Sequence, residues 1–474
     1  MSPGYAPPPG SIPTLDVPIL ETVRSVHMIG IGGAGMRNLA KLFLARGMAV
    51  TGSDLKDSEG LGELREAGAD VVVGHDVEHV GEPDAVIVSS AIRGSNPELA
   101  EARRRGIAVW ARAQALAAAA AQKRTIAVAG THGKTTTTSM VALVLEHAGL
   151  DPTYVIGGDP NETGSGARSG DGELFVAEAD ESDGSFLLLD PAIGIVTNVE
   201  VDHVDFYPGG REEIEAAFSA FARRCELVVV CADDEGAMRA VRAAGVPITT
   251  YGTSATADVR VEVAASGPGG ARADLLVDGT THPMRLEVDG AHNVLNAAAA
   301  VASAGAVGVP PTEAIRALGS FSGVHRRFEL RASARGADFY DDYGHVPTEL
   351  AVTLDVARRT GPRRLVAVFQ PHRYSRTQAL WRELGASLVE ADVVVVTDVY
   401  GAAQDPIPGV TGKLVVEGLN RAAGGKRVVY LPHRSDVVEF LRREVREGDL
   451  VVTMGCGDVW MLGDAAVEAI RERA

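Results

Sequence analysis

Two glycine-rich turns limit the folds open to this chain more than any other feature. The first, Gly30-Ile31-Gly32-Gly33-Ala34-Gly35, follows the apolar run RSVHMIGI, and the second, Gly130-Thr131-His132-Gly133-Lys134-Thr135-Thr136, follows the run TIAVA. Each turn leads into a stretch with helical periodicity. A strand, a glycine turn and a helix in this order begin a parallel β-α-β unit. The two turns therefore predict α/β domains built on parallel sheets.

The first turn matches the G-x-G-x-x-G pattern of dinucleotide-binding folds. Its glycines let a diphosphate approach the backbone and a helix N-terminus, and Asp54, at the end of the next strand, is placed for a ribose hydroxyl. A nucleotide sugar meets this description as well as NAD does. A turn that only packs helix on strand is the third interpretation.

The second turn resembles a phosphate-binding loop. Backbone N–H groups at a helix N-terminus bind phosphate, Lys134 would reach the β- and γ-phosphates, and Thr135 or Thr136 would place a hydroxyl on Mg²⁺. Two residues instead of the usual four separate the first glycine from Gly-Lys. The alternative is a solvent-exposed lysine on a turn.

Acidic side chains follow two later strands. The run LFVAEADESDGS contains Glu178, Asp180 and Glu181, and TNVEVDHVDFY contains Asp202 and His203. Carboxyl ends of parallel strands lie on the ligand side of a sheet, where a carboxylate and an imidazole can hold Mg²⁺. We expect Glu178 and His203 to bind the metal, against the alternative of a solvated acidic loop.

Two further patches carry polar groups in the second half of the chain. Asn293 and Asn296 lie three residues apart at the start of an alanine-rich helix, where they cap the helix or bind a base or ribose. On the residues alone the cap is the favoured interpretation. Arg373 and Arg376 follow the apolar run LVAVFQ and suit forked contacts with carboxylate or phosphate.

The length of 474 residues predicts three domains. We expect a flexible tail at 1–20, a Rossmann-like domain at 21–122, a central ATP-binding domain at 123–330 with short antiparallel strands over 252–290, and a C-terminal Rossmann-like domain at 331–474. The net charge of −18 argues against a general binder of nucleic acid or anionic membrane. Three cysteines without a C-x-x-C pair predict neither a disulfide framework nor a zinc site, and fit a cytoplasmic location.

Eight motifs together resemble the Mur ligase family. They occur in the family's order over nearly the whole chain after residue 21: GIGGAGM, AGTHGKTTTT, AEADESDGSFL, TNVEVDHVDFY, HNVLNA, GVHRRFE, DDYGHVPTE and FQPHRYSRT. The resemblance implies that the N-terminal domain binds a UDP-sugar, the central domain binds ATP and the C-terminal domain receives an amino acid.

The resemblance also implies roles for individual residues. The UDP-sugar contacts are Gly30, Gly32, Gly33, Ala34, Gly35, Asp54 and Ser89. The ATP contacts are Gly130, Thr131, His132, Gly133, Lys134, Thr135, Thr136, His292, Asn293, Asn296, Arg327 and Asp342, and the metal ligands are Thr135, Glu178 and His203. The amino-acid and closing contacts are His345, Arg373 and Arg376.

Two features refine the resemblance. Several family members use a carbamylated central-domain lysine at their second magnesium, whereas this chain has no lysine between Lys134 and Lys413. This agrees with the alanine-adding type of the family. In addition, Arg37 and Asn38 stand where the family usually has small residues. A cation in the first turn of a helix is unfavourable to the helix dipole but could meet a phosphate, so the residues leave the effect of this departure open.

The expected reaction joins L-alanine to UDP-N-acetylmuramate, with ATP and Mg²⁺, through an acyl phosphate in peptidoglycan synthesis. Lys134, Glu178, His203 and His345 are the expected catalytic residues, with His345 a candidate base. The alternatives are a recycling ligase that adds a tripeptide to the same sugar, an NAD(P)-dependent dehydrogenase and a non-catalytic ATP-binding regulator. The expected partners are small molecules, with no nucleic acid or membrane, and the expected state is a monomer or homodimer.

Overall fold

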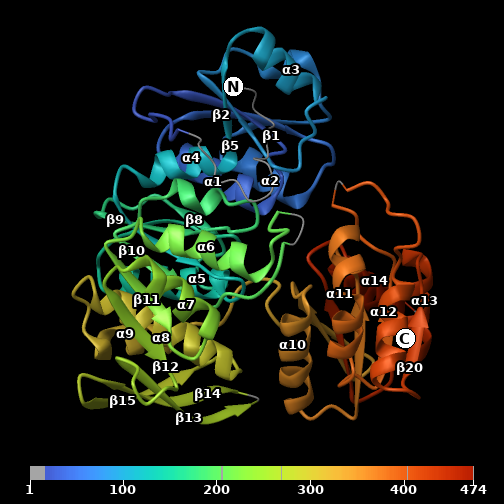
Figure 1. Cartoon of the computed structure of the whole chain (residues 1–474). Coiled ribbons are helices and arrows are strands. Elements are labelled where there is room, and N and C mark those ends of the chain that lie inside the picture. The colour runs from blue at the N-terminus through green and yellow to red at the C-terminus, as the bar shows by residue number, and fades with distance from the viewer. Residues whose placement is uncertain (1–15, 204–205, 268, 403, 473–474) are drawn as a thin grey trace. The chain divides into compact units, whose positions relative to one another are not determined.

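The computed structural model describes residues 16–203, 206–267, 269–402 and 404–472 (Figure 1). Most of the predicted tail, residues 1–15, lies outside this part of the chain. The described residues form three sheets in chain order. By internal contacts they fall into two compact units: the N-terminal unit extends to Ser266 and includes Gly270–Ser322, and the C-terminal unit runs from Gly323 onward.

The first sheet is fully parallel, with strand order β3-β2-β1-β4-β5. Its strands are β1 (Ser25–Ile29), β2 (Ala49–Asp54), β3 (Asp70–Val73), β4 (Ala85–Val88) and β5 (Ala108–Ala111). Its helices are α1 (Ala34–Ala45), α2 (Glu59–Glu66), α3 (Pro97–Arg104) and α4 (Arg112–Ala120). The strand order reverses between β1 and β4, and ligands of such sheets bind beyond the carboxyl ends at that point. The first glycine turn leaves β1 there.

Local sequence explains the burial of β4 and the start of α3. The strand AVIV (β4) is buried along its whole length, as expected for a strand covered on both faces. Helix α3 begins after Asn96, whose side chain accepts hydrogen bonds from the N–H groups of Glu98 and Leu99, and Pro97 occupies its first position.

The second sheet has ten strands in the order β15-β14-β13-β12-β11-β10-β6-β9-β7-β8. The strands that precede the predicted phosphate-binding and metal-binding residues are β6 (Arg124–Ala129), β9 (Leu174–Glu178) and β10 (Ile193–Val196). The others are β7 (Thr153–Val155), β8 (Ala167–Arg168), β11 (Leu227–Cys231), β12 (Ile248–Gly252), β13 (Val259–Gly267), β14 (Gly270–Val277) and β15 (Thr280–Leu286). The helices are α5 (Lys134–His147), α6 (Arg211–Ala222), α7 (Glu235–Ala244), α8 (Ala291–Gly305) and α9 (Pro311–Leu318).

Strand pairing in this sheet brings together the three segments that carry the predicted phosphate-binding and metal-binding residues. β6 pairs in parallel with both β9 and β10, so the residues after these three strands meet at one edge. The predicted antiparallel addition is present as the pair β14–β15, whereas β13 pairs with β12 in parallel.

The third sheet has the order β16-β17-β21-β18-β19-β20 and is parallel except for β16. Its strands are β16 (Glu329–Ala334), β17 (Ala337–Asp342), β18 (Arg364–Phe369), β19 (Val393–Val396), β20 (Arg427–Tyr430) and β21 (Asp449–Met454). Its helices are α10 (Pro347–Arg359), α11 (Tyr374–Ser387), α12 (Lys413–Ala422), α13 (Arg434–Glu444) and α14 (Trp460–Arg471). The carboxyl ends of β17, β21 and β18 are therefore neighbours.

The three sheets confirm the predicted class of three α/β domains, while the predicted boundaries at 122 and 330 stay predictions. None of the helices in the described ranges combines the length and the apolar character that crossing a membrane requires.

Candidate active site

The second glycine turn forms a tight loop between β6 and α5. Gly130 has a φ of 142° and Gly133 a φ of 78°, which are conformations that favour glycine. A Cβ atom on Gly130 would lie 1.9 Å from Oγ1 of Thr197, the residue after β10, so a larger residue does not fit. The loop delivers the chain into the N-terminus of α5, whose first N–H groups lack partners within the helix. This is the geometry of a phosphate-binding turn.

Residues that follow β10 hold the loop in shape. The N–H groups of Thr131 and His132 donate to the backbone and side-chain oxygens of Asn198, at 3.0 and 2.8 Å. The hydroxyl of Thr197 donates to the carbonyl oxygen of His132 at 2.6 Å, and His132 Nε2 lies 3.1 Å from a carboxylate oxygen of Glu200. These contacts preorganise the loop without using its lysine.

Lys134 lies at the centre of the site. Its Nζ donates to the carbonyl of Gly130 at 2.6 Å and lies 2.8 and 3.0 Å from the two carboxylate oxygens of Glu181. Burial alone would lower the pKa of Lys134, but Glu181, Asp180 and Glu178 raise it above its usual value. Lys134 is therefore a mostly buried cation, and its interpretation as a solvent-exposed turn lysine is wrong.

Glu178, the last residue of β9, contacts the start of α5. One of its carboxylate oxygens accepts a hydrogen bond from Thr135 Oγ1 at 3.1 Å, and the other accepts from the N–H of Gly157 at 2.8 Å. Two of the predicted metal ligands are thus in direct contact. Thr136 is half-buried in the first turn of α5.

Glu181 and Asp180 belong to the site, although neither was among the predicted site residues. Burial and the nearby Asp180 raise the pKa of Glu181 to about 7, even though Lys134 lowers it. Lys134 and Arg112, the latter 3.6 Å away, lower the pKa of Asp180 against the effect of burial. The acidic run ADESD was noted in the sequence, but nothing in it indicated which carboxylate would turn inward.

His203 lies close to the carboxylates of Asp202 and Glu181. Its Nε2 is 3.4 Å from a carboxylate oxygen of Asp202 and 4.0 Å from one of Glu181, and its φ is 50°. Its role as a ligand stays a prediction.

The donor set suits a hard divalent cation. Carboxylates of Glu178, Asp180 and Glu181 lie around one ammonium group, that of Lys134, and all three interact with its charge. Mg²⁺ prefers oxygen ligands such as these and the Thr135 hydroxyl. The residues present therefore fit the metal.

Helix α8 brings the predicted adenine and ribose contacts to the loop. Asn296 Oδ1 accepts from the hydroxyl of Thr137 at 3.2 Å and faces Gly133, where an added Cβ would lie 2.8 Å from it. Asn293 donates from Nδ2 to the carbonyl of Asp289 at 2.6 Å. The favoured cap interpretation is wrong, because α8 begins after Gly290 and has no side-chain cap. His292 is exposed beside Gly290.

The first glycine turn lies at the end of β1 as predicted. Gly30 has a φ of 77° and packs on Ser89, and the N–H of Gly32 donates to a carboxylate oxygen of Asp54 at 3.0 Å. Asp54 thus faces the loop itself. The remaining residues of the turn are Gly33, which precedes α1, Ala34, which begins it, and Gly35, which packs on Arg112.

Arg37 does not face an open phosphate position. Its guanidinium is paired with the carboxylate of Asp159, in the segment after β7, and lies 3.7 Å from Glu63. Asn38 is fully buried and donates to the carbonyl of Ile156 at 2.9 Å. Arg37 and Asn38 thus connect α1 with the segment after β7.

In the C-terminal unit, Asp342 ends β17 and is buried. Its oxygens accept from the N–H groups of Gly344 and Phe328 at 2.7 and 2.9 Å, and burial raises its pKa to about 6 although Arg327 lowers it. Arg327 lies over the ring of Tyr343, 5.2 Å from its centroid. A buried carboxylate with a raised pKa at a strand end is a frequent mark of a functional site.

His345 follows β17, and Arg373 and Arg376 follow β18; these two strands flank β21 in the sheet. His345 Nδ1 is 3.1 Å from the carbonyl oxygen of Tyr343, and Arg376, 5% exposed, has Nη1 3.3 Å from Nδ1 of His372. Arg373 precedes α11 with a φ of 66°. The fold thus gathers these predicted residues, and adds His372, which the sequence argument quoted within a motif but did not assign.

Family models match three consecutive stretches of the chain. These are the Mur ligase family catalytic domain at residues 25–124, the Mur ligase middle domain at 128–304 and the Mur ligase glutamate ligase domain at 326–457.

Curated relatives match over almost the whole length. The UDP-N-acetylmuramate–L-alanine ligase of Thermobifida fusca is 47% identical, with 95% of this chain and 98% of the relative covered. The enzyme of the same name from Kineococcus radiotolerans is 48% identical, with 94% and 96% covered.

Solved structures agree with these matches. The UDP-N-acetylmuramate-alanine ligase MurC of Thermotoga maritima superposes with a TM-score of 0.81 at 30% identity, covering 95% of this chain and all of that one. A murein peptide ligase of Psychrobacter arcticus gives 0.75 at 25% identity, with 94% and 98% covered. As its eight motifs predicted, this chain belongs to the Mur ligase family.

Proposed function

We propose that the chain is an ATP-dependent ligase that joins L-alanine to UDP-N-acetylmuramate in peptidoglycan synthesis. The observation that carries the proposal is its 47% identity, over 95% of its length, to a relative named for this reaction. The geometry agrees, because Lys134 and Thr135 follow the phosphate-binding loop and Glu178, at the end of β9, contacts Thr135.

The recycling ligase is the second candidate, since the murein peptide ligase of Psychrobacter arcticus has the same fold. The identity of 25% and TM-score of 0.75 are both lower than the 30% and 0.81 of the alanine-adding enzyme from Thermotoga maritima. The curated relatives at 43–48% identity also carry the alanine-adding name. The comparisons thus favour alanine as the added group.

The chemistry needs two steps, because a carboxylate is a poor electrophile. A carboxylate oxygen of the UDP-sugar first attacks the γ-phosphorus of ATP, which forms an acyl phosphate and releases ADP. The alanine amine then attacks the acyl carbon, phosphate leaves and the amine loses a proton. Lys134 and the N–H groups at the start of α5 are positioned to offset the charge on the transferring phosphoryl group.

Thr135, Glu178 and His203 would hold Mg²⁺, which supplies charge neutralisation at the phosphates when bound. His292, Asn293 and Asn296 are proposed for adenine and ribose, beside the loop that Asn296 touches. Arg327 and Asp342 are proposed as further ATP contacts. The first turn, with Asp54 and Ser89, is proposed for the UDP-sugar.

The C-terminal unit supplies the proposed amino-acid contacts. The guanidinium groups of Arg373 and Arg376 suit the alanine carboxylate. If Nδ1 of His345 donates its proton to the Tyr343 carbonyl, Nε2 keeps a lone pair that can accept the proton of the amine. The cytoplasmic location and the state as monomer or homodimer stay predictions.

The test is phosphate release from ATP with Mg²⁺ and UDP-N-acetylmuramate, with and without L-alanine. Release that needs both substrates supports the proposal. Release with tripeptide but not with alanine would identify the recycling ligase instead. Binding of NAD without any release would support the dehydrogenase, and ATP binding without turnover would support the regulator.

A further inference from the structure

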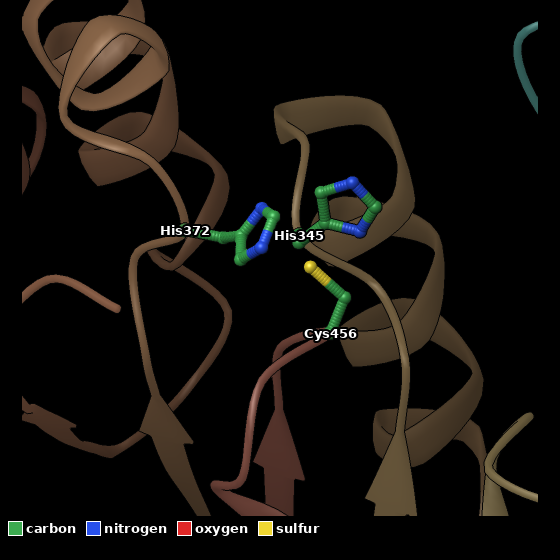
Figure 2. A group of neighbouring side chains, drawn as sticks. All are labelled: His345, His372 and Cys456. Carbon is green, nitrogen blue, oxygen red and sulfur yellow. The ribbon is translucent and has the colours of Figure 1, made fainter. Parts of the chain in front are cut away.

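Three metal-binding side chains meet at one edge of the third sheet. His345 follows β17, His372 follows β18 and Cys456 follows β21, and these strands are neighbours in the sheet. One ligand atom from each residue lies within 4.8 Å of the others. Figure 2 shows the imidazole of His372 and the thiol of Cys456 turned toward each other, with His345 beside them. All three residues belong to the C-terminal unit.

We propose that His345, His372 and Cys456 form a binding site for Zn²⁺ or a similar transition-metal dication. Two imidazoles and one thiolate are a donor set that Zn²⁺ accepts and Mg²⁺ does not. Zinc bonds of about 2.0–2.3 Å place tetrahedral ligands about 3.5 Å apart, so the ligand atoms, which lie within 4.8 Å of one another, need to approach by about 1.3 Å at most. Three protein ligands leave the fourth position for water or a small molecule.

The surroundings favour a bound imidazole at His345. Its Nδ1 lies 3.1 Å from the carbonyl oxygen of Tyr343 and 3.5 Å from a carboxylate oxygen of Glu349. A metal-bound histidine usually donates its other ring N–H to such a carbonyl or carboxylate, which fixes the ring. Metal binding through Nε2 of His345 would preserve this contact, whereas binding through Nδ1 would replace it.

Binding at Cys456 releases a proton. Burial raises the pKa of the thiol to about 12, so the metal-free thiol is protonated near neutral pH. The balanced step is thiol plus M²⁺ giving a metal thiolate plus H⁺. Affinity should therefore rise with pH, because the bound metal displaces the thiol proton.

Metal binding at His372 breaks one existing hydrogen bond. Arginine only donates, so Nδ1 of His372 accepts from Nη1 of Arg376 in the metal-free protein. A metal-bound neutral imidazole uses one nitrogen for the metal and carries its proton on the other, which leaves no acceptor for Arg376. Arg376 is a proposed amino-acid contact, so the metal should inhibit the ligase; this consequence rests on the proposed function, whereas the site itself does not.

The primary test is titration of the full chain with Co²⁺ alone, followed by absorbance, and then displacement by Zn²⁺. One equivalent of Co²⁺ should give a thiolate-to-cobalt charge-transfer band that Zn²⁺ abolishes. Cys456→Ala should lose the band and bind Zn²⁺ at least about 100-fold more weakly, since even the loss of an outer partner costs 10–100-fold. The matched control is Cys231→Ala, which removes a buried thiol of the central sheet and should keep the band.

Several results would overturn the site. They are the absence of a charge-transfer band, a band that Cys456→Ala retains, or a His372→Ala variant with unchanged Zn²⁺ affinity. In the activity assay Zn²⁺ should inhibit the unaltered chain, and Cys456→Ala should resist inhibition at equal Zn²⁺. Absence of the band in the unaltered chain refutes the site whatever the activity is. Absence of ligase activity refutes the proposed function and leaves the band unaffected.

Discussion

Replacement of Lys134 by methionine tests how far the candidate site depends on one buried charge. Nζ of Lys134 lies 2.8 Å from a carboxylate oxygen of Glu181, which is 1% exposed. At an effective dielectric constant of about 20 this attraction is about 6 kcal/mol, opposed by several kcal/mol of desolvation. Removing one partner leaves a buried charge, which costs about 3–5 kcal/mol. We expect Lys134→Met to lower the free energy of unfolding by that amount at pH 8.

The companion variant removes the unpaired carboxylate as well. Lys134→Met with Glu181→Gln should recover most of the lost stability, because a neutral amide replaces the buried charge. It should not recover activity, since phosphoryl transfer still lacks the lysine, and we expect at least a 100-fold loss of rate in both variants. Thermal unfolding is the assay, and about 2–4 °C per kcal/mol predicts a drop of about 6–20 °C for the single variant.

Comparing the stability loss at pH 6 and at pH 8 extends this test. Burial and Asp180 raise the pKa of Glu181 to about 7, so below pH 7 this carboxyl group carries its proton even with Lys134 present. The ion pair then contributes less, and the single variant should lose about 1 kcal/mol less stability at pH 6 than at pH 8. Equal melting temperatures for Lys134→Met and the unaltered chain at pH 8, or no recovery in the double variant, would refute the reasoning.

Three further predictions concern other parts of the molecule. Glu178→Gln keeps the size of the side chain but removes its charge, and phosphate release should fall at least about 100-fold with an unchanged melting temperature; near-normal release would contradict a metal role. Arg37→Ala and Asp159→Asn should each lower stability by about 1 kcal/mol, and the double variant should lose no more than either alone. Glu98 is fully buried; burial alone would raise its pKa, but His27 and other partners lower it to about 2. The ionised Glu98 therefore stabilises the fold above pH 4.5, and Glu98→Gln should unfold more easily at pH 6. The difference should vanish as the pH falls toward 2, as urea titrations can measure.

The sequence predicted the backbone of the candidate site better than its side-chain contacts. Gly130 and Gly133 indicated a glycine-rich loop between a strand and a helix, and the loop lies between β6 and α5, with positive φ at both glycines. The pairing of Lys134 with Glu181 could not be foreseen, because it depends on β9 lying beside β6 and on which carboxylate of ADESD turns inward. Periodicity identifies strands, but their order in a sheet comes from packing between distant segments.

The same reasoning explains the cluster in the C-terminal unit. Cysteine spacing in the sequence indicated no zinc site, and spacing rules apply only where ligands lie on one local motif. His345, His372 and Cys456 come from three strands that are neighbours in space but far apart in the chain. The strand order β17-β21-β18 creates the group, so only the fold could reveal it.

Arg37 and Asn38 stand where the family usually has small residues, and only the folded chain explains them. Asn38 is fully buried and donates to the carbonyl of Ile156, and an added Cβ on Gly166 would lie 2.1 Å from its Nδ2, so the side chain fills this space completely. The next residue, Gly157, donates its N–H to Glu178. The helix that begins at the first glycine turn is thereby joined, through two hydrogen bonds and one peptide unit, to the carboxylate beside the second. Asn38, which is larger than the residues usual at this turn, thus connects the two glycine turns.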